Sequence, residues 1–152
     1  MSGRRPVGKI LVVDDEPTVR ASASAILQQF GYDVVTAVDG QDAVERAAAE
    51  GESIRLVLLD YAMPRMDGEA AFHAIREIIP TVRIILSSGY STADLARRLY
   101  DSGLDACLPK PYGAGELAGM VGRLLHTDVA PLSGPLAGLP DGSRDGYDGR
   151  VA

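Results

Sequence analysis

Polar residues that can take part in chemistry follow four apolar runs of this sequence. They are Asp14, Asp15 and Glu16 after the first run, Asp60 after the third, Ser87 and Ser88 at the fourth, and Lys110 after the fifth. Carboxylates that lie close together repel one another. Mg²⁺ relieves this repulsion because it takes oxygen ligands and keeps waters free for phosphate oxygens. A lysine supplies positive charge to phosphate, and a hydroxyl group donates to a phosphoryl oxygen. Together, these acids, hydroxyls and the lysine predict a site that holds a phosphoryl group on or near a carboxylate.

The elements that must position these residues alternate along the chain. Short aliphatic runs occur at residues 10–13, 34–36, 54–59, 82–86 and 106–108. The third and fourth runs are almost continuously hydrophobic, which is typical of strands covered on both faces by helices. Apolar residues at helical spacing lie between and after the runs. The pattern predicts an α/β domain with a doubly wound (βα)5 fold and a five-stranded parallel sheet of the flavodoxin-like type.

In such a sheet, ligands bind beyond the carboxyl ends of the strands, so these polar residues are expected at one edge. Each residue taken alone has a simpler interpretation. Asp15 or Glu16 would cap a helix that begins at Pro17, and Lys110 would be a solvated loop charge. Their joint placement at separate strand ends favours a site instead. Lys110 also stands between two prolines in CLPKPY, a stiff frame suited to positioning.

The composition narrows the class of protein. The 152 residues are enough for one domain, and 46% apolar with 24% charged residues is ordinary for a globular protein. The formal net charge of −6 argues against direct binding of nucleic acid or of anionic membranes. The single cysteine excludes an internal disulfide, and the apolar stretch near the N-terminus is too short for a signal peptide or a membrane span. We expect a cytoplasmic protein.

Three parts are expected along the chain. Residues 1–7 form an N-terminal arm, residues 8–126 the folded domain, and residues 127–152 a disordered tail or linker. The last part is rich in Gly, Pro, Asp and Ser. It has too few apolar residues to offset the entropy of ordering, which is why we interpret it as disordered.

Four segments, in this order and spacing, resemble the receiver domain of two-component response regulators. The segments are ILVVDDEPTVR, LVLLDYAMPRMDGEA, IILSSGYS and CLPKPY, and the resemblance covers residues 8–126. It implies a phosphoprotein switch that accepts a phosphoryl group from a histidine kinase or phosphotransfer protein and signals by docking to a downstream protein. It also implies that the chain is not an enzyme beyond self-catalysed phosphoryl transfer and autodephosphorylation.

The resemblance implies a magnesium site around the phosphoacceptor. Asp60 corresponds to the residue that becomes an aspartyl phosphate. Asp15, Asp60 and the main-chain carbonyl of Ala62 correspond to Mg²⁺ ligands, and Asp14 corresponds to the residue that holds a metal-bound water. The dipeptide Asp67–Gly68 corresponds to the turn that starts the third helix.

Two phosphate contacts are implied as well. Lys110 corresponds to the lysine that contacts phosphoryl oxygens, with a cis bond to Pro111. The switch hydroxyl corresponds to Ser88 rather than Ser87, because the family spacing to the lysine is matched by 110 − 88 = 22. In this interpretation, the domain promotes phosphoryl transfer mainly by holding the reacting groups in position.

One position departs from the family pattern. Cys107 stands three residues before the lysine, where the family usually has Tyr or Phe, whose ring turns inward on activation. A cysteine has no ring that could turn between two pockets, so we do not expect the usual movement of an aromatic side chain on activation. Tyr90, Tyr100 and Tyr112 are expected in or near the same face as candidates to replace it. We interpret Cys107 itself as a small buried side chain.

A phosphatase is the alternative function. Asp14, Glu16 and Thr18 in VVDDEPT are similar to the first motif of haloacid-dehalogenase-type phosphatases, which also use Mg²⁺ and an aspartyl phosphate. That motif has Asp where Glu16 stands. The residue that takes up phosphate distinguishes the two functions: Asp60 for a receiver, Asp14 for a phosphatase.

The origin of the receiver has two interpretations. The segment LSSGYS and the missing aromatic favour a receiver of a hybrid histidine kinase, whereas Met1 favours a stand-alone protein. The sequence leaves the cognate kinase, its signal and the downstream target open.

Overall fold

The strands of the protein form one parallel sheet in a computed structural model that describes residues 8–63, 66–89 and 93–126. The strand order is β2-β1-β3-β4-β5. The strands are β1 Lys9–Val13, β2 Asp33–Ala37, β3 Ile54–Asp60, β4 Arg83–Ser88 and β5 Ala106–Pro109. The chain reverses its direction of progress across the sheet after β2, which makes the boundary between β1 and β3 the point where ligand sites form in such sheets.

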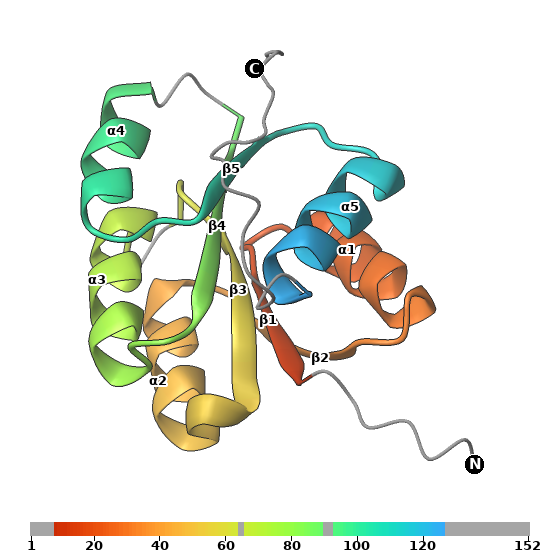
Figure 1. Cartoon of the computed structure of the whole chain (residues 1–152), viewed down its shortest axis with the longest axis horizontal. Coiled ribbons are helices and arrows are strands. Elements are labelled where there is room, and N and C mark those ends of the chain that lie inside the picture. The colour runs from red at the N-terminus through yellow and green to blue at the C-terminus, as the bar shows by residue number, and fades with distance from the viewer. Residues whose placement is uncertain (1–7, 64–65, 90–92, 127–152) are drawn as a thin grey trace. The chain divides into compact units, whose positions relative to one another are not determined.

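Helices follow the strands and cover both faces of the sheet (Figure 1). They are α1 Pro17–Gln29, α2 Gly40–Glu50, α3 Gly68–Ile78, α4 Ala93–Asp101 and α5 Ala114–Leu125, with a 3₁₀ turn η1 Gly51–Ser53 before β3. α1 and α5 lie on one face, and α2, α3 and α4 lie on the other. The predicted doubly wound (βα)5 fold is confirmed, and each strand falls on one of the predicted apolar runs.

Burial on both faces explains why the central runs do not alternate. Along β3, Val57 and Leu59 belong to the cluster shared with α2 and α3, whereas Leu56 and Leu58 point to the opposite face. All four are at most 3% exposed. Burying a side chain of this size stabilises a fold by about 1.5–3 kcal/mol. Asp60, at the end of the strand, shares the face of Leu56 and Leu58, which is the face of α1.

Side-chain caps begin two of the helices. Asp39 accepts a hydrogen bond from Asp42 N at 2.8 Å at the start of α2, and Asp67 accepts one from Ala70 N at 2.9 Å at the start of α3. The predicted turn at Asp67–Gly68 is therefore confirmed. The simpler interpretation of Glu16 as a capping side chain is wrong, because Glu16 occupies the cap position of α1 without a side-chain hydrogen bond.

Residues 1–7 and 127–152, which were expected to be an arm and a tail, lie outside the described residues. Among the described residues, no helix is both long and apolar enough to cross a bilayer.

Candidate functional site

Three aspartates meet at the boundary between β1 and β3. Val13 and Leu59 are register partners, so Asp14 and Asp60 end up side by side at the carboxyl edge of the sheet. Both are buried, at 4% and 3% exposure, whereas Asp15 is exposed. One carboxylate oxygen from each of the three lies within 4.8 Å of the others. The structure thus brings together the three acids that the sequence predicted, as a group that can hold a metal ion.

Lys110, directly after the edge strand β5, contacts two of these acids. Its Nζ lies 2.8 Å from Asp14 Oδ2 and 3.3 Å from Asp60 Oδ1. Its main-chain N donates to Ser88 O at 2.9 Å, which fastens the end of β5 to the end of β4. The Lys110–Pro111 peptide bond is cis, as the resemblance implied. The lysine is therefore held where it can neutralise charge on both buried carboxylates.

Burial and crowding set the protonation of the site. Burial raises the pKa of Asp60 to about 6, and the charge of Asp14 adds to this rise while Lys110 opposes it. For Lys110, burial acts to lower the pKa, but the hydrogen bonds and charges of Asp14 and Asp60 outweigh it, so the pKa is raised. One lysine does not compensate the acids completely, and a cation would be favoured at this site.

The start of α1 orients Asp14. Asp14 Oδ1 accepts a hydrogen bond from Glu16 N at 3.0 Å, and the main-chain carbonyl of Asp14 accepts one from Arg20 at 2.7 Å. Asp14 N in turn donates to Ala37 O of β2 at 3.2 Å. Arg20 was not identified from the sequence. It follows Asp14 by six residues, and the two come into contact because α1 begins at Pro17, directly after the acids.

The loop after β3 folds back tightly on the site. Gly68 N donates to Tyr61 O at 2.8 Å, and a Cβ at Gly68 would lie 2.6 Å from Tyr61 Cα and 2.9 Å from Asp60 O. Only glycine fits this approach. Ala62, whose carbonyl the resemblance implies as a metal ligand, lies two residues after Asp60 in this loop.

The two hydroxyl residues at the end of β4 are both buried. Ser88 is 6% exposed and Ser87 is 2% exposed. Ser87 is the register partner of Asp60, and Ser88 is the partner of Pro109, directly before Lys110. The predicted switch residue is thus placed at the same edge of the sheet as the acids and the lysine.

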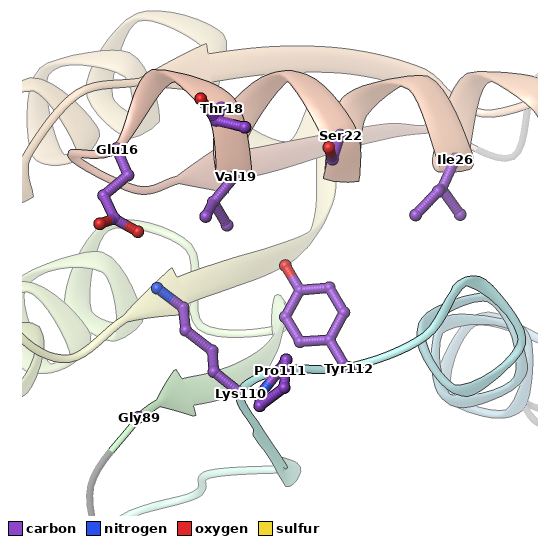
Figure 2. Close-up of a pocket in the computed structure, with 9 residues that line it drawn as sticks. All are labelled: Glu16, Thr18, Val19, Ser22, Ile26, Gly89, Lys110, Pro111 and Tyr112. Carbon is purple, nitrogen blue, oxygen red and sulfur yellow. The ribbon is translucent and has the colours of Figure 1, made fainter.

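A groove of about 490 Å³ opens beside the site (Figure 2). Its walls are α1 on one side and the segment after β5 on the other. The lining residues are Glu16, Thr18, Val19, Ser22, Ile26, Gly89, Lys110, Pro111 and Tyr112. Figure 2 shows Lys110 and Tyr112 projecting from the same segment toward α1. The groove gives an approaching group access to the lysine.

The tyrosines expected near Cys107 separate between the two faces of the sheet. Cys107 packs against the core cluster on the side of α3 and α4, and Tyr100 of α4 lies beside its thiol. Burial raises the pKa of the Cys107 thiol. Tyr112 instead lines the groove against α1, so the expectation that it shares a face with Tyr100 is wrong. Tyr90 lies outside the described residues.

The fold and the acidic edge define a class of signalling domain. The family model described as response regulator receiver domain matches residues 10–122. The chain belongs to this family, and it is a receiver domain of two-component systems. The matches give no support to a haloacid-dehalogenase-type phosphatase.

Individual relatives agree with this assignment. The chain is 34% identical over 117 residues to the sensor kinase CckA of Brucella abortus, covering 77% of this chain but 12% of the kinase. It is 34% identical over 114 residues to the chemotaxis protein CheY of Treponema pallidum, covering 72% of this chain and 79% of CheY. The structure is similar to the CheX–CheY–BeF₃–Mg²⁺ complex of Borrelia burgdorferi, with a TM-score of 0.73 and 26% identity, covering 76% of this chain and 87% of that one. The relatives therefore include receivers of kinase-regulated systems.

Proposed function

We propose that the chain accepts a phosphoryl group on Asp60 from the phosphohistidine of a histidine kinase or phosphotransfer protein. The observation that supports this best is the ion-pair geometry at Lys110, whose Nζ contacts the buried carboxylates of Asp14 and Asp60 at 2.8 and 3.3 Å. A lysine so placed meets a phosphoryl group on Asp60 without a large movement. The hydroxyl of Ser88 is the second phosphate contact.

Mg²⁺ is the proposed metal. The donor set consists of carboxylate oxygens within 4.8 Å of one another, which is the hard-oxygen environment that Mg²⁺ prefers. We assign Asp15, Asp60 and the Ala62 carbonyl as its ligands, with Asp14 holding a bound water. When bound, the metal supplies charge neutralisation for the phosphoryl oxygens. The Borrelia burgdorferi CheY complex, which contains Mg²⁺ and beryllofluoride, supports this choice by similarity.

The remaining proposals concern the whole chain. Residues 8–126 act as the receiver, with residues 1–7 as an arm and residues 127–152 as a tail or linker. The phosphorylated domain signals by a conformational change and docking to a protein, not by enzyme turnover or direct binding of nucleic acid, and it does so in the cytoplasm. The net charge of −6 and the single cysteine support these proposals.

The test is phosphorylation with acetyl phosphate and Mg²⁺, followed by intact-mass spectrometry. We expect one added phosphate on the wild type and none on Asp60→Asn, because an amide is not a nucleophile for phosphorus. Asp33→Asn, which changes an exposed carboxylate at the start of β2, is the matched control and should take up phosphate normally. Undiminished uptake by Asp60→Asn would remove Asp60 from its role, and loss of uptake in Asp14→Asn with retention in Asp60→Asn would return the phosphatase alternative.

A further inference from the structure

Ser87 carries a buried hydroxyl group for which the proposed reaction has no role. The residue is 2% exposed, and its Oγ has no hydrogen-bond partner within the described part of the chain. The other unpaired buried polar atom found there, Arg76 Nε, belongs to a guanidinium whose other two nitrogens donate to main-chain carbonyls. Burying a hydroxyl without a partner costs free energy, because its hydrogen bonds to water are lost. Such a group calls for an explanation.

The strand register places Ser87 next to Asp60. The two residues are partners between β3 and β4, and neighbouring strands lie about 4.8 Å apart. Register partners point to the same face, so Ser87 flanks the Asp60 carboxyl group on the β4 side while Asp14 flanks it on the β1 side. Tyr61 N donates to Ser87 O at 2.9 Å and holds the two strands together at this level. On the other side, the register partner of Ser87 is the apolar Leu108.

We propose that Ser87 donates a hydrogen bond to the Asp60 carboxyl group during hydrolysis of the aspartyl phosphate and thereby shortens the lifetime of the phosphorylated state. This inference rests on the proposed function of Asp60. In the hydrolysis, the oxygen of water forms a bond to phosphorus. The bond between phosphorus and the Asp60 oxygen breaks, its electron pair goes to the carboxylate, and both protons of the water leave with the phosphate.

Negative charge develops on the Asp60 carboxylate as this bond breaks. Lys110, which contacts Asp60 Oδ1 at 3.3 Å here, turns to the phosphoryl oxygens in the proposed phosphorylated state. The hydroxyl of Ser87 is then a buried donor beside the carboxylate with no competing partner among the described residues. A donor placed where charge develops in a water-poor site stabilises the transition state more than the ground state. Ser87 therefore accelerates the loss of phosphate, in a role separate from the phosphate contact assigned to Ser88.

The test measures the half-life of the phosphorylated protein for the wild type, Ser87→Ala and Ser87→Cys. Each protein is loaded with acetyl phosphate and Mg²⁺, desalted into Mg²⁺ buffer, and followed by intact-mass spectrometry. We expect both variants to hold the phosphate about three- to tenfold longer, the size of effect expected for the loss of one ordinary hydrogen bond. Ser53→Ala in η1, whose hydroxyl donates to Glu50 O far from the site, should have the wild-type half-life. The melting temperature of unphosphorylated Ser87→Ala should equal or exceed that of the wild type.

The two variants separate hydrogen bonding from packing, because alanine empties space around the side chain and cysteine fills it. An unchanged half-life in Ser87→Ala, or shifts in opposite directions for Ala and Cys, overturns the inference. If the wild type takes up phosphate and Asp60→Asn does not, such results leave the proposed function standing. A wild type that takes up no phosphate overturns both.

Discussion

The three aspartates of the site carry more negative charge than the single lysine beside them can neutralise. Asp14 and Asp60 share the one ammonium group of Lys110, with contacts of 2.8 and 3.3 Å. Burial and the neighbouring charge still raise the pKa of Asp60 to about 6, so the attraction of the lysine does not offset the other two effects. The metal-free protein therefore folds against a local electrostatic cost that a bound cation would remove.

This electrostatic cost should make the stability of the metal-free protein depend on pH. Burial and the neighbouring charge of Asp14 raise the pKa of Asp60 from its ordinary value of 3.8 to about 6, so the native state binds more protons than the unfolded state between these pH values. Wild-type stability should therefore fall as the pH rises from about 4 through 6. In EDTA at pH 7.5, Asp60→Asn should be more stable than wild type by up to about 3 kcal/mol, since one pKa unit corresponds to about 1.4 kcal/mol.

Urea unfolding at pH 4, 5, 6 and 7.5 measures this difference. The advantage of Asp60→Asn should shrink as the pH falls and nearly vanish at pH 4. Asp33→Asn, which alters an exposed carboxylate, should differ from wild type by less than about 0.5 kcal/mol throughout. A variant that is less stable than wild type at pH 7.5 would mean that the pairing with Lys110 outweighs burial and repulsion.

At the scale of elements, close main-chain approach connects α3 to the phosphoacceptor. A Cβ at Gly68 would lie 2.6 Å from Tyr61 Cα. Gly68→Ala should therefore destabilise the fold by about 1–3 kcal/mol, as overpacking does. It should also slow phosphate uptake, because the loop that carries Ala62 must shift. The matched control is Gly119→Ala on α5, where an added Cβ would meet no atom from another part of the fold within 4 Å, so alanine should raise the free energy of unfolding by about 0.5–1 kcal/mol. Equal stability for the two variants would show that the loop yields without strain.

A second element-scale prediction concerns the opposite edge of the sheet. Arg76 of α3 donates to the carbonyls of Pro80, Val82 and Gly103, and it lies 3.5 Å from Asp105. Asp105 also accepts a hydrogen bond from Ile84 N at 2.8 Å. The planar fork of arginine makes these contacts at once, and lysine cannot.

Arg76→Lys should lower the free energy of unfolding by about 2 kcal/mol, because main-chain carbonyls on three segments lose the guanidinium donor that they share. Urea unfolding at pH 7.5 measures this change in the free energy of unfolding. Arg97→Lys, at a site where the side chain is 78% exposed and its acidic neighbour Asp94 lies 3.8 Å away, should leave stability within about 0.5 kcal/mol. Phosphate uptake should be unchanged in both variants, since neither arginine belongs to the cluster of Asp14, Asp15 and Asp60 or contacts it.

At the scale of the whole molecule, the route from the phosphate to a docking surface is the open question. Coupling needs an element with two distinct packings that the phosphate biases. Cys107 on β5 offers little difference between two such packings. Tyr100, which lies beside Cys107 on α4, is 47% exposed, and Tyr112 lies on the other side of the sheet.

We therefore expect activation to change mainly the end of β4 and the loop that follows it. Amide NMR shifts on addition of beryllofluoride and Mg²⁺ should be largest around Asp60 and Ser88 and small over residues 105–117. Asp60→Asn should show no such response and serves as the control. Changes over residues 105–117 as large as those at Ser88 would identify another switch in place of the missing aromatic. We expect a partner to recognise mainly the segment from Ser88 to Thr92, including Tyr90; residues 90–92 lie outside the described residues.

The fold class and the cluster of Asp14, Asp15 and Asp60 could be predicted from the sequence. Almost continuous apolar runs such as residues 54–59 are typical of strands covered on both faces, so these runs, with helical spacing between them, predicted the parallel sheet. Acids, hydroxyls and a lysine directly after such runs had to meet at one edge, because parallel strands end together. The start of α3 at Asp67–Gly68 was expected as well, from the resemblance to receiver domains.

The contacts among these residues depend on strand order and register, which became known from the structure. The order of β1 beside β3 made Asp14 and Asp60 neighbours, and the register of β4 placed Ser87 rather than another residue beside Asp60. The sequence predicted Tyr100 and Tyr112 on one face, but α4 and the segment after β5 carry them to opposite faces. Local spacing determines the face of a strand or helix, whereas pairing between distant segments depends on packing that no short stretch of sequence contains.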